Sequence, residues 1–143
     1  MPAICVTEPK YICPIANKKS YMAFIPAVLV AAGIAVASLW EQPCLPAGFA
    51  GSDKLLHGLM YAILAAATMG GMVVIRRTQI RSYMGVVIGA TLYGALLELL
   101  QHFCTEYRTG DIVDVYADCL GALAGVLFIA LLYYSRQQFK HKK

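Results

Sequence analysis

The stretch VYADCLGALAGVLFIALLYY, residues 115–134, decides the fold. It is long enough to cross a hydrocarbon core of about 30 Å, which takes about 20 apolar residues in a helix. A helix satisfies all its backbone polar groups internally, as a membrane span must, so we predict a transmembrane helix here. The stretch contains one acid, Asp118. A charged group inside a span costs about 2.5–3.5 kcal/mol on insertion scales, so we expect Asp118 to face other helices rather than lipid.

Three further apolar stretches of similar length precede it, at roughly 21–40, 55–75 and 82–103, and the last of these contains Glu98. Of the 143 residues, 59% are hydrophobic and 14% are charged. Soluble domains run near 45–50% apolar and about 25% charged. The sequence therefore predicts an all-α integral membrane bundle of four transmembrane helices, and it excludes a disordered chain and a nucleic-acid binder.

The basic residues predict the orientation of this bundle. Ten of the twelve Lys and Arg residues lie in the N-terminal tail, in the second loop and in the C-terminal tail: Lys10, Lys18, Lys19, Arg76, Arg77, Arg81, Arg136, Lys140, Lys142 and Lys143. The positive-inside rule assigns all three segments to the cytoplasm. We therefore expect a cytoplasmic tail over 1–20, one four-helix domain over 21–134 and a basic cytoplasmic tail over 135–143, with both termini inside.

The first apolar run also resembles a signal peptide, because two lysines precede it. It continues to Trp40, which is long for a signal sequence, so we expect an uncleaved anchor kinked at Pro26. Cys44 and Cys104 are both expected outside, where oxidising conditions would permit a disulfide, and whether they pair is left open.

With this orientation, most of the remaining polar residues gather at the outer ends of the last three spans. They are Asp53, Lys54, His57, Glu98, Gln101, His102, Arg108, Asp111, Asp114 and Asp118. Residues four apart share a helix face, so His57 aligns with Tyr61, and Asp114 with Asp118. Because Glu98 would lie about 7–8 Å below Phe103, at about 1.5 Å per residue, we expect a partly buried pocket that opens outward.

Small residues indicate where the helices approach one another. Gly121 and Gly125 continue the stripe of Asp118 in a small-xxx-small pattern, which permits close helix contact in membranes. Gly85 and Gly89 form a second such pair in the third span, and we expect the same role for them.

Several functions fit this outer-face site. We assign acid/base roles to Glu98, Asp114 and His57, since carboxylates and imidazole exchange protons with a substrate. We assign ligand binding to Asp53, Lys54, Tyr61, Gln101, Arg108, Asp111 and Asp118. In a non-catalytic alternative, the same residues form a structural clasp that sets helix register. A proton or cation path through Glu98 and Asp118 is a third option and would require an oligomer.

A divalent metal is a further candidate, because carboxylates with His57 and His102 suit such an ion, but the sequence contains no HExxH or cysteine-pair motif. We therefore assign no metal ligand, and the sequence identifies no cofactor. A serine nucleophile elbow, a phosphate-binding glycine loop and a Rossmann fingerprint are also absent from the sequence. Whether the protein is an enzyme is therefore left open.

The ordered polar residues resemble the VanZ-like family over roughly Trp40 to Leu132. The resemblance rests on DKLLH at 53–57 with Tyr61, then on Glu98, Gln101, Phe103, Arg108, Asp111 and Asp114, and on DCLGALAG at 118–125. Many members have Asn where this chain has Asp118. The family consists of small bacterial membrane proteins named after one associated with low-level teicoplanin resistance. The resemblance implies a multi-pass protein of the bacterial plasma membrane that acts at the cell envelope, and it carries no established reaction.

Together these observations predict an envelope protein that binds or modifies a lipid-linked or glycopeptide-related ligand and affects glycopeptide susceptibility. The alternative is a membrane scaffold or partner subunit without catalytic activity. We expect membrane lipids as partners, with a lipid-linked cell-wall intermediate or a glycopeptide as ligand and no nucleic acid. A homo-oligomer is left open.

Overall fold

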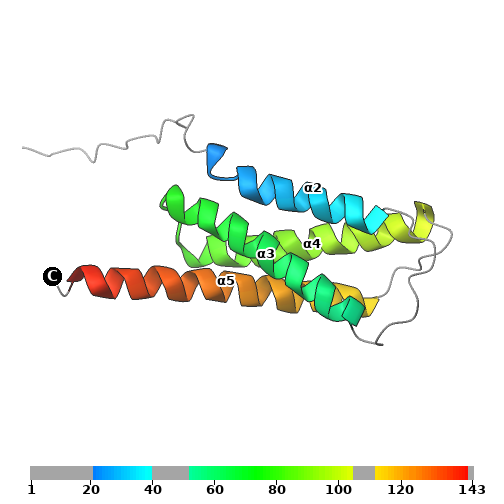
Figure 1. The fold of residues 1–143 in the computed structure, drawn as a ribbon. Helices are drawn as coiled ribbons and strands as arrows, with labels where there is room; N and C mark the ends of the chain where they lie inside the picture. Colours follow the sequence, from blue (N-terminus) through cyan, green and yellow to red (C-terminus); the bar gives the residue numbers. More distant parts are fainter. Residues whose placement is uncertain (1–20, 40–51, 105–111, 142–143) are drawn as a thin grey trace, which may run out of the picture.

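A computed structural model describes residues 21–39, 52–104 and 112–141, and it shows four helices in this part of the chain. They are α2 (Ile25–Leu39), α3 (Ser52–Val74), α4 (Ile80–Cys104) and α5 (Ile112–His141), packed side by side as a bundle (Figure 1). The described residues contain no strand, so the all-α prediction is confirmed. By length and composition, α3, α4 and α5 can each cross a membrane.

Helix α2 is shorter than the expected 20-residue span. It has 15 residues, which corresponds to about 22 Å at about 1.5 Å per residue. Tyr21 and Met22 are helical, but a turn at Ala23 and Phe24 separates them from α2. Pro26 accounts for this break, because proline has no N–H to donate to the carbonyl four residues earlier and its ring crowds that carbonyl. The predicted kink therefore lies at the start of α2, and three helices of spanning length are established.

A tight turn connects α3 to α4. Arg77 N–H donates to the Met72 carbonyl at 2.9 Å, and Arg76 N–H donates to the Val73 carbonyl at 3.0 Å. These two bonds form a Schellman motif, in which the residue after the helix is left-handed. Arg76 takes that conformation with φ of 58°. The chain thus reverses within a few residues, and α4 runs back along α3.

The closest helix contact joins α5 to α3. A Cβ added at Gly121 would overlap the Gly58 carbonyl oxygen, and one added at Gly125 would overlap the Ala62 carbonyl oxygen. Only glycine allows the two backbones to approach so closely, and α3 makes more contacts with α5 than with any other helix. The predicted role of this small-residue stripe is confirmed.

The corresponding expectation for Gly85 and Gly89 is wrong within the described residues. A Cβ at either position would meet no atom within 4 Å. Both glycines instead line an open cavity of about 540 Å³ between α2, α3 and α4, whose wall is almost entirely apolar and includes Arg81 and Tyr93. Small side chains here leave space rather than bring two helices together.

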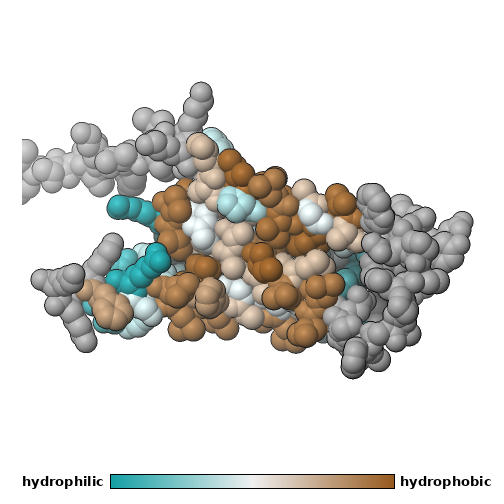
Figure 2. Space-filling model, in the orientation of Figure 1, coloured by the Kyte–Doolittle hydropathy of each residue, from teal (hydrophilic) through white to brown (hydrophobic). Residues whose placement is uncertain are grey.

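The buried core is thin, and the outer surface is apolar. Tyr61, Ala65, Met69 and Ala122 are at most 2% exposed, whereas many large apolar side chains are exposed. Figure 2 shows apolar residues along the middle of the bundle and hydrophilic ones at the end where α5 finishes. An apolar exterior of this kind suits a lipid environment, because lipid tails cover it without cost. The last turns of α5 continue the helix through Arg136 to His141, over most of the segment expected as a basic tail.

Candidate functional site

Four helix termini meet at the end of the bundle opposite the α3–α4 turn. The last turns of α2 and α4 lie there beside the first turns of α3 and α5 (Figure 1). Antiparallel neighbours place the start of one helix beside the end of the next, so residues far apart in sequence come together here. Four buried residues define what we call the polar cluster: His57 of α3, Glu98 of α4, and Asp114 and Asp118 of α5.

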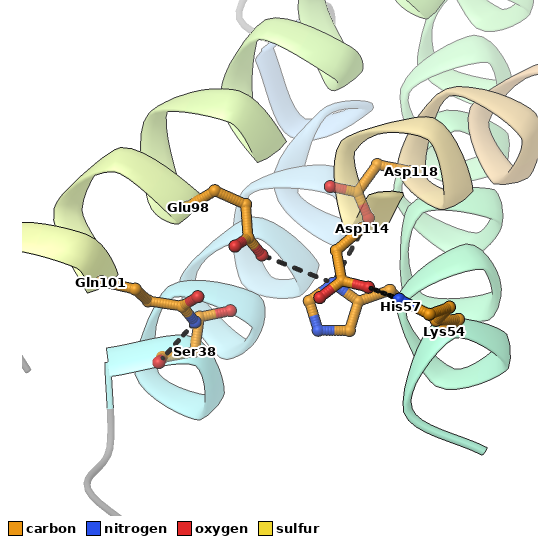
Figure 3. A network of polar contacts seen from close by, with 7 residues as sticks. All are labelled: Ser38, Lys54, His57, Glu98, Gln101, Asp114 and Asp118. Carbon is orange, nitrogen blue, oxygen red and sulfur yellow. Dashed lines mark hydrogen bonds and ion pairs between the residues drawn. The ribbon is translucent and has the colours of Figure 1, made fainter. Parts of the chain in front are cut away.

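His57 is the centre of the polar cluster. Its Nδ1 lies 3.5 Å from Asp118 Oδ1 and 3.8 Å from Glu98 Oε1, so one imidazole nitrogen faces carboxylates from two helices (Figure 3). The side chains of His57 and Glu98 are 7% and 10% exposed. A proton shared between these groups, or a cation bound between them, fits this geometry. Either one would stabilise carboxylates that are held away from water.

Asp118 is the most deeply buried member, with a side chain 1% exposed. Neither of its carboxylate oxygens accepts a hydrogen bond from any described residue. Gly94 of α4 makes room for it, because a Cβ at Gly94 would overlap Asp118 Oδ2 and would lie 3.2 Å from the Tyr61 ring. The absence of a side chain at Gly94 therefore admits the Asp118 carboxylate between α4 and α5.

Asp114 lies nearer the surface of the bundle. Lys54 Nζ is 3.4 Å from Asp114 Oδ1, with the lysine side chain 45% exposed and the aspartate 12% exposed. A pair this accessible to solvent contributes little stability, about 0–1 kcal/mol. It places one positive charge beside the three carboxylates of the polar cluster.

Gln101 is buried, but its amide nitrogen binds α2. Gln101 Nε2 donates to the Ser38 carbonyl at 2.8 Å, as Figure 3 shows at some distance from His57. Tyr93 Oη similarly donates to the Ala31 carbonyl at 2.8 Å. These two bonds attach α2 to α4. Sequence reasoning missed Ser38 and Ala31, because a backbone acceptor leaves no signature in the sequence.

The remaining predicted site residues are placed as follows. Tyr61 is buried in the core, with its ring 6.4 Å from that of Tyr93. His102 is exposed, and its ring contacts Phe103 edge-on. Some of the predictions lie outside the described residues: the side chain of Asp53, the residues Arg108 and Asp111, and the pairing of Cys44 with Cys104.

The polar cluster is separate from the apolar cavity described above. The cavity of about 540 Å³ is lined by residues such as Ala31, Leu64 and Gly85, and none of the four cluster residues lines it. Chemically, the cluster offers three carboxylates and one imidazole within a membrane bundle, with the Lys54 ammonium at its edge. Such a set can hold a proton or a cation, or bind a polar group that enters from this end of the bundle.

Comparison with known proteins supports one assignment. A family model described as VanZ/LLP1 matches residues 15–133, which include all four described helices up to Tyr133. No curated protein and no solved structure matches the chain.

Proposed function

Because the chain belongs to the VanZ/LLP1 family, we propose that it is an envelope protein of the bacterial plasma membrane that binds or modifies a polar ligand at the outer face. The observation that carries this proposal is the burial of Glu98, Asp118 and His57 within a bundle of otherwise apolar helices. Ionisable groups in membrane spans are costly and generally mark sites where substrates, ions or protons are handled.

The proposed topology has four spans with both termini in the cytoplasm. Arg76, Arg77 and Arg81 at the α3–α4 turn, and Arg136 near the end of α5, support a cytoplasmic location for that end. The polar cluster then belongs to the outer leaflet. Helix α2 serves as the fourth span: its 15 residues are extended toward the cytoplasm by residues 21–24, of which the first two are helical and the last two form a turn.

The proposed ligand is a lipid-linked cell-wall intermediate or a glycopeptide, and the protein lowers susceptibility to glycopeptide antibiotics. Glu98, Asp114 and His57 donate or accept protons, while Lys54 with Arg108 holds an anionic group. The position of Lys54 at the edge of the polar cluster supports this division, because a ligand phosphate could replace the half-exposed contact with Asp114.

The test compares Glu98→Gln and Asp114→Asn with the unchanged protein in cells challenged with teicoplanin. Both variants keep the shape of the side chain and remove its charge. We expect them to abolish the protective effect while membrane abundance and the detergent melting temperature stay near the unchanged values. His102→Gln is the control. His102 is exposed and lies near the end of α4, the helix that carries Glu98, so this variant should protect fully.

The second candidate is a structural clasp in a non-catalytic scaffold. The Gln101 bond to Ser38 favours it, because that contact joins two helices without a ligand. In this case Glu98→Gln and Asp114→Asn would lower abundance and melting temperature together, and any loss of protection would follow the loss of protein. Full protection by both variants at normal abundance would contradict the ligand-handling proposal.

A further inference from the structure

Three members of the polar cluster present metal-binding atoms to one another. His57, Glu98 and Asp114 each offer one such atom, and the three atoms lie within 4.8 Å of one another. All three residues are buried, and each comes from a different helix. Around a tetrahedral ion with ligand distances near 2.1 Å, ligand atoms are about 3.4 Å apart. Side-chain rotations that shorten the longest separation by about 1.4 Å would therefore complete a site.

The environment of Asp118 also favours a cation at this position. Asp118 is 99% buried at its side chain, and neither of its oxygens accepts a hydrogen bond from the described residues. Its carboxylate points toward His57 (Figure 3). Its Oδ2 lies against Gly94. Burying a carboxylate without hydrogen bonds costs several kcal/mol, so such a group is normally neutralised or bound to a positive charge.

The charges around the cluster also favour a bound cation. The cluster contains three carboxylates, and the described cation beside it is the Lys54 ammonium, which lies against Asp114 at the solvent side. Asp118 and Glu98 are instead grouped around the imidazole of His57. A divalent ion among these groups would balance the two inner carboxylates and allow the imidazole to bind in its neutral form.

We propose that the polar cluster binds one divalent cation of the Zn²⁺ or Mn²⁺ class through His57, Glu98, Asp114 and Asp118. One imidazole with carboxylates is a donor set suited to these ions, whereas a site built only from oxygen atoms would favour Mg²⁺ or Ca²⁺. The sequence offered a metal as one candidate for this site but assigned no ligand to it. The proposed ligands lie on three helices and form no local motif, so spacing could not show which of them come together.

This inference goes beyond the proposed function and does not depend on it. Metal binding can be measured on the protein alone, without a lipid-linked ligand or an antibiotic. A bound ion would also offer a positive centre to an anionic group of a ligand, in the manner of a Lewis acid. A protein that binds metal but has no effect on teicoplanin susceptibility would support the metal site and contradict the function proposed above.

The test uses full-length protein in detergent, without a polyhistidine tag, stripped with EDTA and then incubated with Zn²⁺ or Mn²⁺. After desalting, metal is counted by mass spectrometry. We expect about one ion of Zn²⁺ or Mn²⁺ per chain, retained by His102→Ala and lost by His57→Ala and Asp118→Asn. His102 is the matched control, because it is an exposed histidine that contacts Phe103.

The melting temperature provides a second measurement in case His57→Ala fails to fold. Metal that binds only the folded state raises the melting temperature. Addition of the ion should therefore raise it for the unchanged protein and for His102→Ala, but not for the nearly isosteric Asp118→Asn. The proposal is overturned if the unchanged protein retains no metal, or if a folded Asp118→Asn protein retains as much as the unchanged one.

Discussion

Replacing Gly121 with alanine tests the packing that holds α5 against α3. A Cβ at this position would overlap the Gly58 carbonyl oxygen and would lie 2.7 Å and 2.9 Å from the carbonyl carbon and Cα of Gly58. These are backbone atoms, so no side-chain rotation relieves the overlap. The carbonyl carbon must retreat from 2.7 Å to at least 3.4 Å, an ordinary contact distance, which requires the two helices to separate.

Gly89→Ala is the matched control, because a Cβ at Gly89 meets no atom within 4 Å. Alanine favours a helix over glycine by about 1 kcal/mol, and this gain applies to both variants and cancels in their difference. Overpacking costs about 1–3 kcal/mol, so we expect Gly121→Ala to be less stable than Gly89→Ala by this amount. At about 4 °C per kcal/mol, the melting temperatures should differ by about 4–12 °C.

The assay is thermal unfolding of both purified variants in the same detergent, followed by the fluorescence of a thiol-reactive dye or by light scattering. Gly89→Ala should melt at or slightly above the temperature of the unchanged protein, and Gly121→Ala below it. Equal melting temperatures for the two variants would refute the close approach of α3 and α5 from which the geometry of the polar cluster follows.

Three smaller effects follow from single contacts. Tyr93→Phe removes the bond to the Ala31 carbonyl and should lower stability by about 1 kcal/mol, measured as a shift in thermal midpoint. Lys54→Met should change the stability by less than about 1 kcal/mol, because the contact of Lys54 with Asp114 is half-exposed. A larger loss would show that this ion pair contributes more than a solvent-exposed one. Arg76→Gly should raise the stability by about 1 kcal/mol, since glycine takes a φ of 58° without strain. A lower thermal midpoint for this variant would refute the left-handed conformation at Arg76.

Much of the helical architecture follows from hydropathy. The stretches expected at 82–103 and 115–134 lie within α4 and α5, and the one expected at 55–75 lies within α3 up to Val74, because an apolar run of about 20 residues has few structural alternatives. The ends were harder to locate, since α5 continues to His141 through polar residues that remain helical outside an apolar span. The start of α2 depends on one proline, whose effect could have been a kink or a break.

The sequence predicted which residues share a helix face at the site, but not which helices bring them into contact. Helical spacing placed His57 above Tyr61 and Asp114 above Asp118, and all four are buried. Spacing along one helix cannot show which helix lies opposite, so the approach of His57 to both Glu98 and Asp118 required the structure.

The two glycine pairs illustrate the same limit. Gly121 and Gly85 belong to equivalent sequence patterns, yet the first lies against another backbone and the second lines a cavity. A small-residue stripe permits a close contact, and the arrangement of the neighbouring helices determines whether one forms.

The central claim is that the acids, His57 and the neighbouring basic residues form one site at the outer end of the bundle. Single cysteines at positions 54, 108 and 77, introduced into a chain whose five native cysteines are replaced by serine, can be labelled in intact cells with an impermeant maleimide. The account predicts labelling at positions 54 and 108, and at position 77 only after the membrane is permeabilised. Labelling of 54 and 108 from opposite sides of the membrane would contradict it.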